Sequence, residues 1–157
     1  MPTLPTLDDI QSAHARIAPY IFRTPLRSSF LLSQRVDARV YLKLENWQIT
    51  GSFKPRGAMN KMAMLRAGMK PAPTIAERAR GVVTASAGNH ALGVALAARA
   101  FAISPAVIFL PRTAPQTKVA KLREYPVEIR AVGDSYADAH HAAEQFARET
   151  GATFIHA

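Results

Sequence analysis

Two segments of this sequence hold side chains that can do chemistry together. Residues 86–90 read Ser-Ala-Gly-Asn-His and directly follow an apolar stretch, Gly-Val-Val-Thr-Ala, over residues 81–85. This composition predicts a buried strand, a turn and then the start of a helix. The unpaired N–H groups and the positive dipole end of such a helix favour a carboxylate or a phosphate. Taken alone, the segment fits an anion-binding site and an ordinary capped turn about equally well.

The second segment centres on Lys54, within Gly-Ser-Phe-Lys-Pro-Arg-Gly-Ala over residues 51–58. Ser52 can cap a helix and Pro55 suits its first turn, so we expect Lys54 in that turn. The helix dipole disfavours a further positive charge there, and partial burial would favour the neutral amine that Schiff-base chemistry needs. The plainer alternative is a solvated lysine at the end of a helix.

The elements around these segments alternate in a way that predicts a parallel sheet. Residues 81–85 and 106–110 are typical of buried strands, residues 127–132 of a more exposed strand, and residues 153–155 of the start of a last strand. Helices are expected between them, over residues 91–98, from just after Thr113 to about residue 125, and from the cap at Asp134 or Ser135 to about residue 150. Such alternation is typical of an α/β fold in which helices cover parallel strands.

Short polar residues mark the expected helix starts. Thr6 with Asp9 predicts a capping box, and Thr113 with Gln116 predicts a second one. The last helix is expected to begin at residue 134 or 135. Upstream of Lys54, residues 39–45 alternate as a strand does, whereas residues 25–26 indicate an irregular link.

The charge of the chain allows two interpretations: the chain binds nucleic acid or another polyanion, or its basic excess is balanced by another part of a larger protein. The sequence has 157 residues, 20 Lys and Arg against 11 Asp and Glu, and a formal net charge of +9. A basic domain can bind nucleic acid, but the basic residues are scattered and no Lys/Arg run lies beside aromatic residues, so we expect no nucleic-acid site. There is no cysteine and no apolar leader at the start, which together with the ordinary composition favours a cytoplasmic protein without a membrane segment.

Considered together, the two segments resemble motifs of one enzyme family. Residues 44–58, Leu-Glu-Asn-Trp-Gln-Ile-Thr-Gly-Ser-Phe-Lys-Pro-Arg-Gly-Ala, resemble the cofactor-lysine motif of the threonine/serine dehydratase family. Its members are pyridoxal-phosphate enzymes of fold type II, the tryptophan-synthase-beta-like fold. Residues 84–91 resemble the substrate loop of the same family, and 32 residues separate Lys54 from Ser86, a spacing similar to that of the family. Residues 109–111 and 133–136 also resemble its small domain.

The resemblance implies cofactor roles for three residues. Lys54 is expected to form a Schiff base with the aldehyde of pyridoxal 5'-phosphate and then to act as the base at the substrate Cα. Phe53 is expected to pack near the pyridine ring. Asn89 is expected to donate a hydrogen bond to the phenolic oxygen of the cofactor.

The resemblance also implies a substrate and a reaction. Ser86, Gly88, Asn89 and His90 are expected to hold the carboxylate of a small hydroxy amino acid, serine or threonine. β-Elimination of its hydroxyl group would give a 2-oxo acid and ammonia, with the cofactor as electron sink. No metal is expected, because the adjacent histidines 140–141 point in different directions on a helix.

Three residues depart from the family pattern. Leu92 stands where the family commonly has glutamine, which predicts the loss of a polar contact behind the site. Trp47 stands where leucine is usual, a change of packing. Ala87 occupies the place of a second base in related serine racemases, and alanine cannot move a proton, so dehydration is favoured over racemisation.

The resemblance further predicts that this sequence is an amino-terminal piece of a longer enzyme. Residues 1–80 are expected to form part of the large cofactor domain, residues 81–152 a complete small domain, and residues 153–157 the start of the return to the large domain. No segment resembles the family's glycine-rich phosphate loop, so we expect the piece to be inactive alone and the longer form to be a homo-oligomer. A non-catalytic interaction module and, less favoured, a basic nucleic-acid-binding domain are the alternatives.

Overall fold

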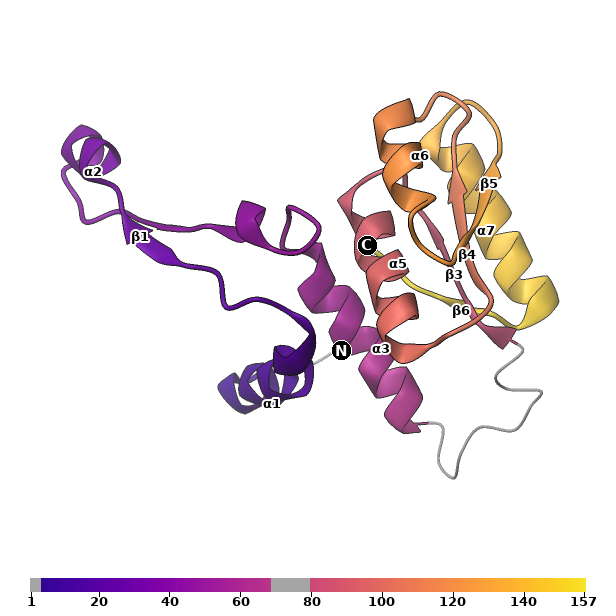
Figure 1. Ribbon diagram of the computed structural model, residues 1–157, viewed down its shortest axis with the longest axis horizontal. Coiled ribbons are helices and arrows are strands. Elements are labelled where there is room, and N and C mark those ends of the chain that lie inside the picture. The colour runs from indigo at the N-terminus through magenta and orange to yellow at the C-terminus, as the bar shows by residue number, and fades with distance from the viewer. Residues whose placement is uncertain (1–3, 69–79) are drawn as a thin grey trace.

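The computed structural model describes residues 4–68 and 80–157, which form a layered body and an arm that extends away from it (Figure 1). The body contains residues 86–90 and Lys54, whereas residues 51–53 of the second chemical segment belong to the end of the arm. The arm consists of residues 22–53 and projects from the side of the body that carries the amino-terminal helix.

The body is built on a four-stranded parallel sheet, as the alternating pattern predicted. Its strands are β3 (Val82–Ala85), β4 (Ala106–Leu110), β5 (Glu128–Ala131) and β6 (Thr153–Phe154). They lie in the order β5-β4-β3-β6, and each neighbouring pair is parallel. The expected α/β fold with helices over a parallel sheet is therefore confirmed. Residues 153–154 belong to this sheet, since they pair with β3.

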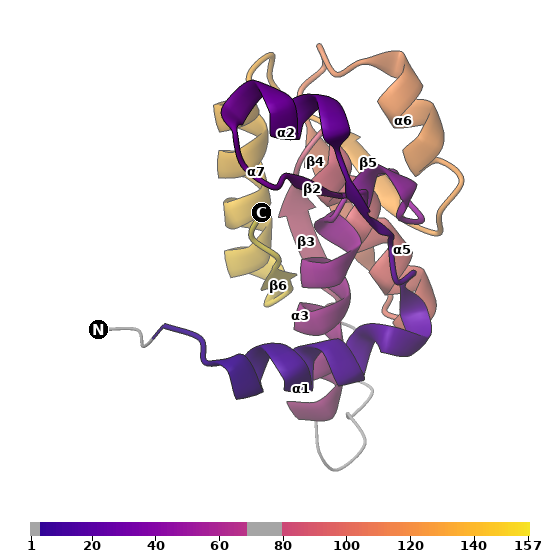
Figure 2. The ribbon, with the colours of Figure 1, turned by 90° about the vertical axis from the view of Figure 1, so that its left-hand side faces the viewer.

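Helices cover both faces of the sheet because alternate residues of its buried strands point to opposite sides. Val107 and Phe109 of β4 pack against α7 (Tyr136–Thr150). Ile108 and Leu110 pack on the other face, under α5 (Asn89–Phe101) and α6 (Gln116–Leu122). A further helix, α3 (Lys54–Gly68), lies on the outside of α5 and buries Met59 against it (Figure 2).

Two of the predicted helix starts are confirmed and one is wrong. In α1 (Leu7–Ile17), the Thr6 hydroxyl accepts from the Asp9 N–H at 3.2 Å, and the Asp9 carboxylate accepts from the Thr6 N–H at 2.8 Å. Ser135 caps α7 in the same way. The box expected at Thr113 does not form, because the Thr113 hydroxyl donates to the carbonyl of Asp134 at 3.0 Å and α6 begins after Pro115.

The arm differs from the sequence expectation in three respects. Residue 26 opens a strand, β1 (Leu26–Ser28), where an irregular link was expected, and β1 pairs antiparallel with β2 (Tyr41–Lys43). The strand expected over residues 39–45 is shorter in the structure, where only residues 41–43 form it. Between the two strands lies a short helix that was not predicted, α2 (Phe30–Val36). Two 3-10 turns complete the segment, η1 (Ala18–Tyr20) before the arm and η2 (Glu45–Trp47) near its end.

A partly buried carboxylate fastens the base of the arm to α3. Arg56 of α3 donates to both oxygens of Glu45 at 2.8 Å, and the Thr24 hydroxyl donates to Glu45 at 2.5 Å. The nearby Gln48 is buried, and its amide exchanges two hydrogen bonds with the backbone of Phe22. These contacts hold the two ends of the arm together next to the first turn of α3.

The Glu45 contacts make the arm sensitive to acid. The hydrogen bonds from Arg56 are the main reason that the pKa of Glu45 lies below its ordinary value of 4.5. A carboxylate with a lowered folded pKa stabilises the fold above its ordinary pKa, and this stability is lost as the pH falls through the lowered value. We expect the arm to loosen below pH 4.5, at a cost of about 1 kcal/mol, with a change in the fluorescence of the single tryptophan, Trp47. Glu45→Gln should remove this step, and equal acid profiles for both proteins would contradict the assignment.

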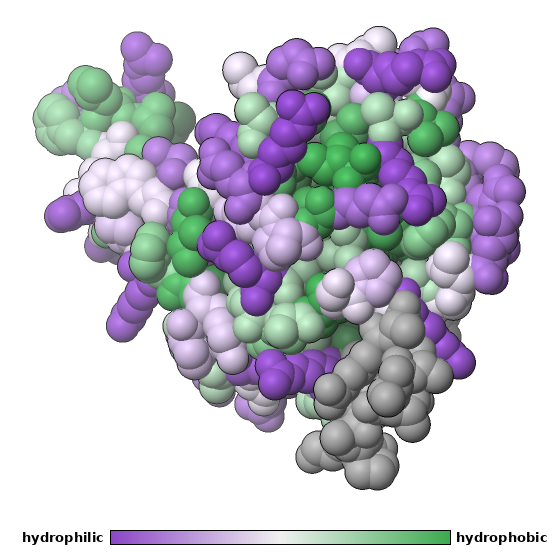
Figure 3. Space-filling model, turned by 45° about the vertical axis from the view of Figure 1, so that its right-hand side comes forward, coloured by the Kyte–Doolittle hydropathy of each residue, from purple (hydrophilic) through white to green (hydrophobic). Residues whose placement is uncertain are grey.

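Most of the exposed apolar side chains lie on the arm. Figure 3 shows hydrophobic surface on this projecting part of the molecule. The residues of the arm with large apolar side chains at least 39% exposed are Phe22, Leu26, Phe30, Leu31, Leu32, Val36, Tyr41, Leu42, Trp47, Ile49 and Phe53. Exposed apolar surface of this extent marks a face that packs against further polypeptide or promotes aggregation. Within the described ranges, no helix combines the length and the apolar composition needed to cross a membrane.

Candidate active site

The start of α3 lies directly against α5, which brings the two chemical segments together. Gly93, in the second turn of α5, is the point of contact. A Cβ atom added to Gly93 would lie 3.1 Å from the carbonyl carbon of Lys54 and 3.2 Å from the nitrogen of Pro55. These distances are shorter than most contacts of a real Cβ atom, so glycine suits this close approach of backbone to backbone. The contact places Lys54 beside the amino-terminal end of α5, where residues 86–90 lie.

Lys54 is held in the first turn of α3, as expected. Its backbone N–H donates to the hydroxyl of Ser52 at 3.4 Å, and Ser52 is buried. The Lys54 side chain is half-buried, and its ammonium nitrogen lies 5.5 Å from the centroid of the Phe53 ring. Phe53 itself is 59% exposed, so its ring face is free to contact a flat molecule.

The loop between β3 and α5 presents a helix end to the same space. Ser86 is fixed by its backbone N–H, which donates to the carbonyl of Phe109 at 2.9 Å. Its side-chain oxygen accepts from the N–H of Gly88 at 3.1 Å, which leaves the Ser86 hydroxyl proton to donate elsewhere. Gly88 is the N-cap of α5 and has no side chain with which to cap the first N–H groups. These N–H groups are the donors that an anion at the helix end would use.

His90 is placed differently from the other members of the predicted set. Its side chain is only 7% exposed, and its Nε2 lies 3.0 Å from the carbonyl oxygen of Ile155, which also accepts from the Thr84 hydroxyl at 2.8 Å. The imidazole thus holds residue 155 against the sheet, and only the backbone N–H of His90 belongs to the start of α5. Burial lowers the pKa of His90, with a smaller opposing effect from Ile155 and a further lowering from the charge of Lys54. The neutral ring therefore stabilises the fold above pH 6.5, and this stability is lost as the pH falls through the lowered pKa.

Asn89 has an exposed side chain at the first position of α5. It is contacted by Lys118, a residue that the sequence did not indicate as part of the site. The ammonium of Lys118, on α6, donates to the Oδ1 atom of Asn89 at 3.4 Å. Lys118 lies 29 residues downstream on another helix, and no local pattern links the two positions. The buried Leu92, one turn along α5, offers no polar group.

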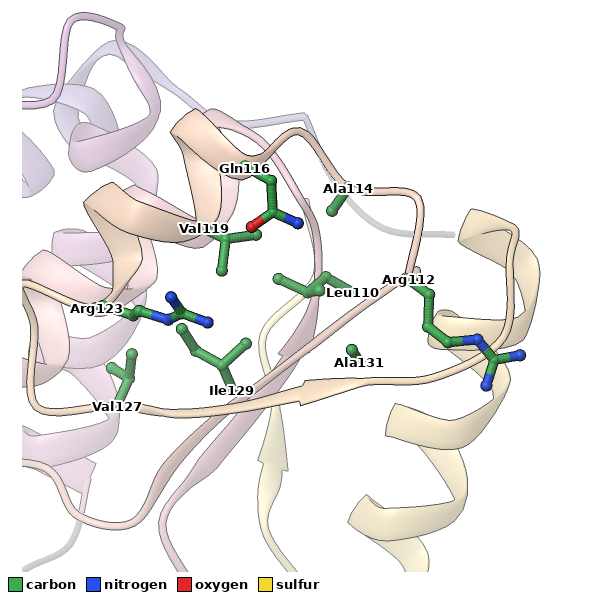
Figure 4. Close-up of a pocket in the computed structure, with 9 residues that line it drawn as sticks. All are labelled: Leu110, Arg112, Ala114, Gln116, Val119, Arg123, Val127, Ile129 and Ala131. Atoms are coloured by element: carbon green, nitrogen blue, oxygen red, sulfur yellow. The ribbon is translucent and has the colours of Figure 1, made fainter.

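A separate groove lies between α6 and β5 (Figure 4). It has a volume of about 410 Å³ and contains neither Lys54 nor residues 86–90. Leu110, Val119 and Ile129 form its apolar floor, and the polar ends of Gln116 and Arg123 point into it. The residues predicted to do chemistry therefore lie at the α3–α5 contact, outside this groove.

Replacement by alanine is expected to change the stability of the protein in opposite directions at Gly93 and at Gly57. Gly93→Ala should destabilise the protein by about 1–3 kcal/mol, because the new methyl group meets backbone atoms that cannot turn away. The substitution should also move Lys54 away from residues 86–90. Gly57→Ala, on the exposed side of α3, is the matched control, since a Cβ there meets nothing within 4 Å. It should stabilise the helix by about 0.5–1 kcal/mol. Urea unfolding measures both, and a neutral Gly93→Ala would contradict the close packing.

With this geometry described, the chain can be compared with known proteins. Residues 17–157 match the pyridoxal-phosphate dependent enzyme family, and the chain belongs to that family. It is 46% identical over 151 residues to the L-threonine ammonia-lyase of Thermotoga maritima, covering 96% of this chain and 35% of that protein. It is 43% identical over 152 residues to the catabolic L-threonine dehydratase TdcB of Staphylococcus aureus, covering 96% of this chain and 41% of that protein.

Solved structures agree with this assignment. Maize serine racemase superimposes with a TM-score of 0.81 at 39% identity, covering 96% of this chain and 43% of that one. The processed form of threonine deaminase isoform 2 from Solanum lycopersicum gives a TM-score of 0.78 at 32% identity, covering 99% of this chain and 42% of that one. The fold type II architecture is therefore confirmed, and the chain spans well under half the length of these relatives. They include both lyases and a racemase, so family membership alone does not decide the reaction.

The residues at the α3–α5 contact fit the cofactor of this family. Lys54 supplies a half-buried amine, Phe53 an exposed ring face, and Asn89 an exposed amide at a helix end. A ring carrying an aldehyde next to a phenolic oxygen matches this set of donors and surfaces, since the amine binds the aldehyde and the amide can donate to the oxygen.

Proposed function

We propose that this chain supplies the lysine and the carboxylate-binding loop of a pyridoxal-phosphate-dependent ammonia-lyase that acts on threonine or serine. The observation that carries the proposal is the contact of Gly93 with the backbone of Lys54, because it sets a half-buried amine beside an uncapped helix start. The identity to two threonine lyases supports the substrate class.

Each residue of the site has a task in this proposal. When bound, pyridoxal phosphate stabilises negative charge at the substrate Cα. Lys54 would hold the cofactor through its amine, and the same amine would take the proton from the substrate Cα. The N–H groups at the start of α5 and the hydroxyl of Ser86 hold the substrate carboxylate, with Gly88 permitting its close approach. Asn89 donates to the phenolic oxygen, and Phe53 covers one face of the ring. His90 contributes through its backbone.

Elimination is favoured over racemisation because one face of the site has no second base at residue 87. Racemisation needs a proton donor opposite the lysine, and Ala87 has no group that exchanges protons. Elimination needs only that the Cα proton passes to Lys54 and that the hydroxyl leaves from Cβ with that proton, as water. The enamine that is left is then hydrolysed by water to a 2-oxo acid and ammonia. We therefore propose a 2-oxo acid and ammonia as products, and no D-amino acid.

The domain organisation and assembly belong to the same proposal. Residues 1–80 contribute to a large cofactor domain, and residues 81–155 form the small domain, which includes β6 and so extends past the expected boundary at residue 152. The chain turns back toward the large domain after β6. The exposed apolar residues of the arm are consistent with further polypeptide packing there. A homo-oligomeric, cytoplasmic enzyme is proposed for the longer form.

A chimaeric enzyme tests the proposed function. The matching region of the Thermotoga maritima L-threonine ammonia-lyase is replaced by residues 1–157, and 2-oxo acid formation from threonine and serine is measured. We expect turnover that depends on added pyridoxal phosphate. Asn89→Ala should weaken cofactor binding far more than stability, because a residue at a helix start contributes only about 1 kcal/mol to the fold. A folded, cofactor-loaded chimaera that forms no 2-oxo acid, or that forms D-amino acid instead, would contradict the proposal.

A further inference from the structure

One contact near the site is explained neither by the fold nor by the roles proposed so far. The half-buried side chain of Lys118 reaches from α6 to the start of α5, where its ammonium meets Oδ1 of Asn89 at 3.4 Å. The sequence led us to expect that a polar contact behind the site is missing, because Leu92 replaces a glutamine. Leu92 is 4% exposed and packs among apolar residues, so it contributes no hydrogen bond to Asn89.

The chemistry of this contact fixes the orientation of the Asn89 amide. An asparagine side chain carries one acceptor oxygen and one NH₂ donor, which can exchange places by a half-turn of the amide. A lysine ammonium has three donors and no acceptor, so only the amide oxygen can face Lys118. The NH₂ group then points away from Lys118 and is free to donate to an acceptor, and a negatively charged oxygen accepts the strongest hydrogen bond from it.

Lys118 is well placed to hold this orientation because its helix is fixed to the sheet. Val119 is 7% exposed and Leu122 is fully buried, and both pack in the cluster under α5 and α6. The backbone N–H of Lys118 donates to the carbonyl of Pro115 at 2.9 Å, which closes the first turn of α6. The ammonium therefore approaches Asn89 from a rigid element.

We infer that Lys118 is a positioning residue that presents the Asn89 amide as a donor to the phenolic oxygen of pyridoxal phosphate. This inference rests on the proposed function. Lys118 acts through Asn89 and touches neither cofactor nor substrate.

The first test is made on the chain without cofactor. The sequence has three asparagines, at positions 46, 60 and 89, so the side-chain amide signals of asparagine-labelled protein are few. Lys118→Met removes the donor and keeps the length of the side chain, and it should shift the Asn89 amide signals. Lys118→Arg, which restores donors, should largely preserve them. Lys121→Met is the matched control, an exposed lysine three residues further along α6. Unchanged Asn89 signals in Lys118→Met would overturn the inference, whatever the cofactor does.

The second test separates orientation of the amide from a general effect of charge. The affinity of the same proteins is measured for pyridoxal phosphate and for an analogue that lacks the phenolic oxygen. Lys118→Met should weaken binding of pyridoxal phosphate about tenfold, the loss expected for one charge-assisted hydrogen bond, and should leave binding of the analogue almost unchanged. Lys118→Arg should restore the difference. In an Asn89→Ala background, Lys118→Met should have no further effect.

The other outcomes of these tests show whether the positioning role of Lys118 or the proposed enzyme function has failed. Equal losses for cofactor and analogue would overturn the positioning role, since they would indicate a general attraction between Lys118 and the phosphate. If the chimaera with the Thermotoga maritima enzyme does not attach the cofactor at Lys54, the proposed function fails, and the amide signals of the chain alone then decide whether Lys118 orients Asn89.

Discussion

Lys54→Ala is expected to abolish covalent attachment of pyridoxal phosphate to this chain and all 2-oxo acid formation by the chimaera. The lysine does two jobs in the proposed reaction, since its amine holds the cofactor aldehyde and later removes the Cα proton. The other lysine that reaches residues 86–90 in the described part of the chain is Lys118, but its ammonium donates to the Asn89 amide oxygen, so Lys54 is the residue expected to do both jobs. Borohydride treatment followed by mass spectrometry of the digested protein measures attachment at the level of the single residue.

The matched control for this prediction lies on the same helix. Lys61 is exposed two turns along α3, so Lys61→Ala changes one charge and leaves the site intact. It should keep attachment at Lys54 and turnover of the chimaera. Turnover that survives Lys54→Ala, or borohydride labelling that falls mainly on another lysine, would refute the assignment of the site.

Purified residues 1–157 alone are expected to form no measurable 2-oxo acid from threonine or serine and to bind pyridoxal phosphate weakly. The chain spans 35% and 41% of the two lyases that it matches, so most residues of those enzymes have no counterpart in it. A phosphate group usually contributes much of the cofactor's affinity through backbone N–H groups. Holding reacting groups in near-attack geometry contributes roughly 7–11 kcal/mol, so an open half-site would lose roughly five to eight powers of ten in rate.

Controls for this second prediction separate an incomplete site from an unfolded or aggregated protein. The exposed apolar residues of the arm promote self-association, so the assay is run beside circular dichroism and light scattering. Reversible trapping of the cofactor at Lys54 in folded, dispersed protein would show that the amine is competent. Tight cofactor binding together with enzyme-like turnover by residues 1–157 would contradict the prediction.

The sequence predicted the body of the molecule well because its signals are local. The boxes at Thr6 and Ser135 lie within four residues of one helix start, and the buried strands at 82–85 and 106–110 are continuous apolar runs. The juxtaposition of Lys54 with residues 86–90 came from the family resemblance. The close contact at Gly93, which physically accounts for it, was not predicted, because it depends on how two helices pack.

The errors occurred where a side chain or a strand finds its partner far along the chain. Thr113 was expected to cap its own helix, yet its hydroxyl bonds to the carbonyl of Asp134, 21 residues away. The helix α2 lacks a side-chain cap and exposes apolar residues, so neither capping nor periodicity indicated it. The hydrogen bond from Lys118 to Asn89 crosses between two helices. Such tertiary contacts are decided by the geometry of the fold, which a scan of short windows does not contain.

The position of β6 bears on the order in which this chain can fold during synthesis. β3 is formed early, but its outer edge is paired only when Thr153 and Phe154 arrive, and the Thr84 hydroxyl finds the carbonyl of Ile155, 71 residues away, at the same step. Closing so long a loop delays this pairing relative to the local helices. Until residue 155 has left the ribosome, β3 is therefore an open edge that strands of neighbouring nascent chains can join.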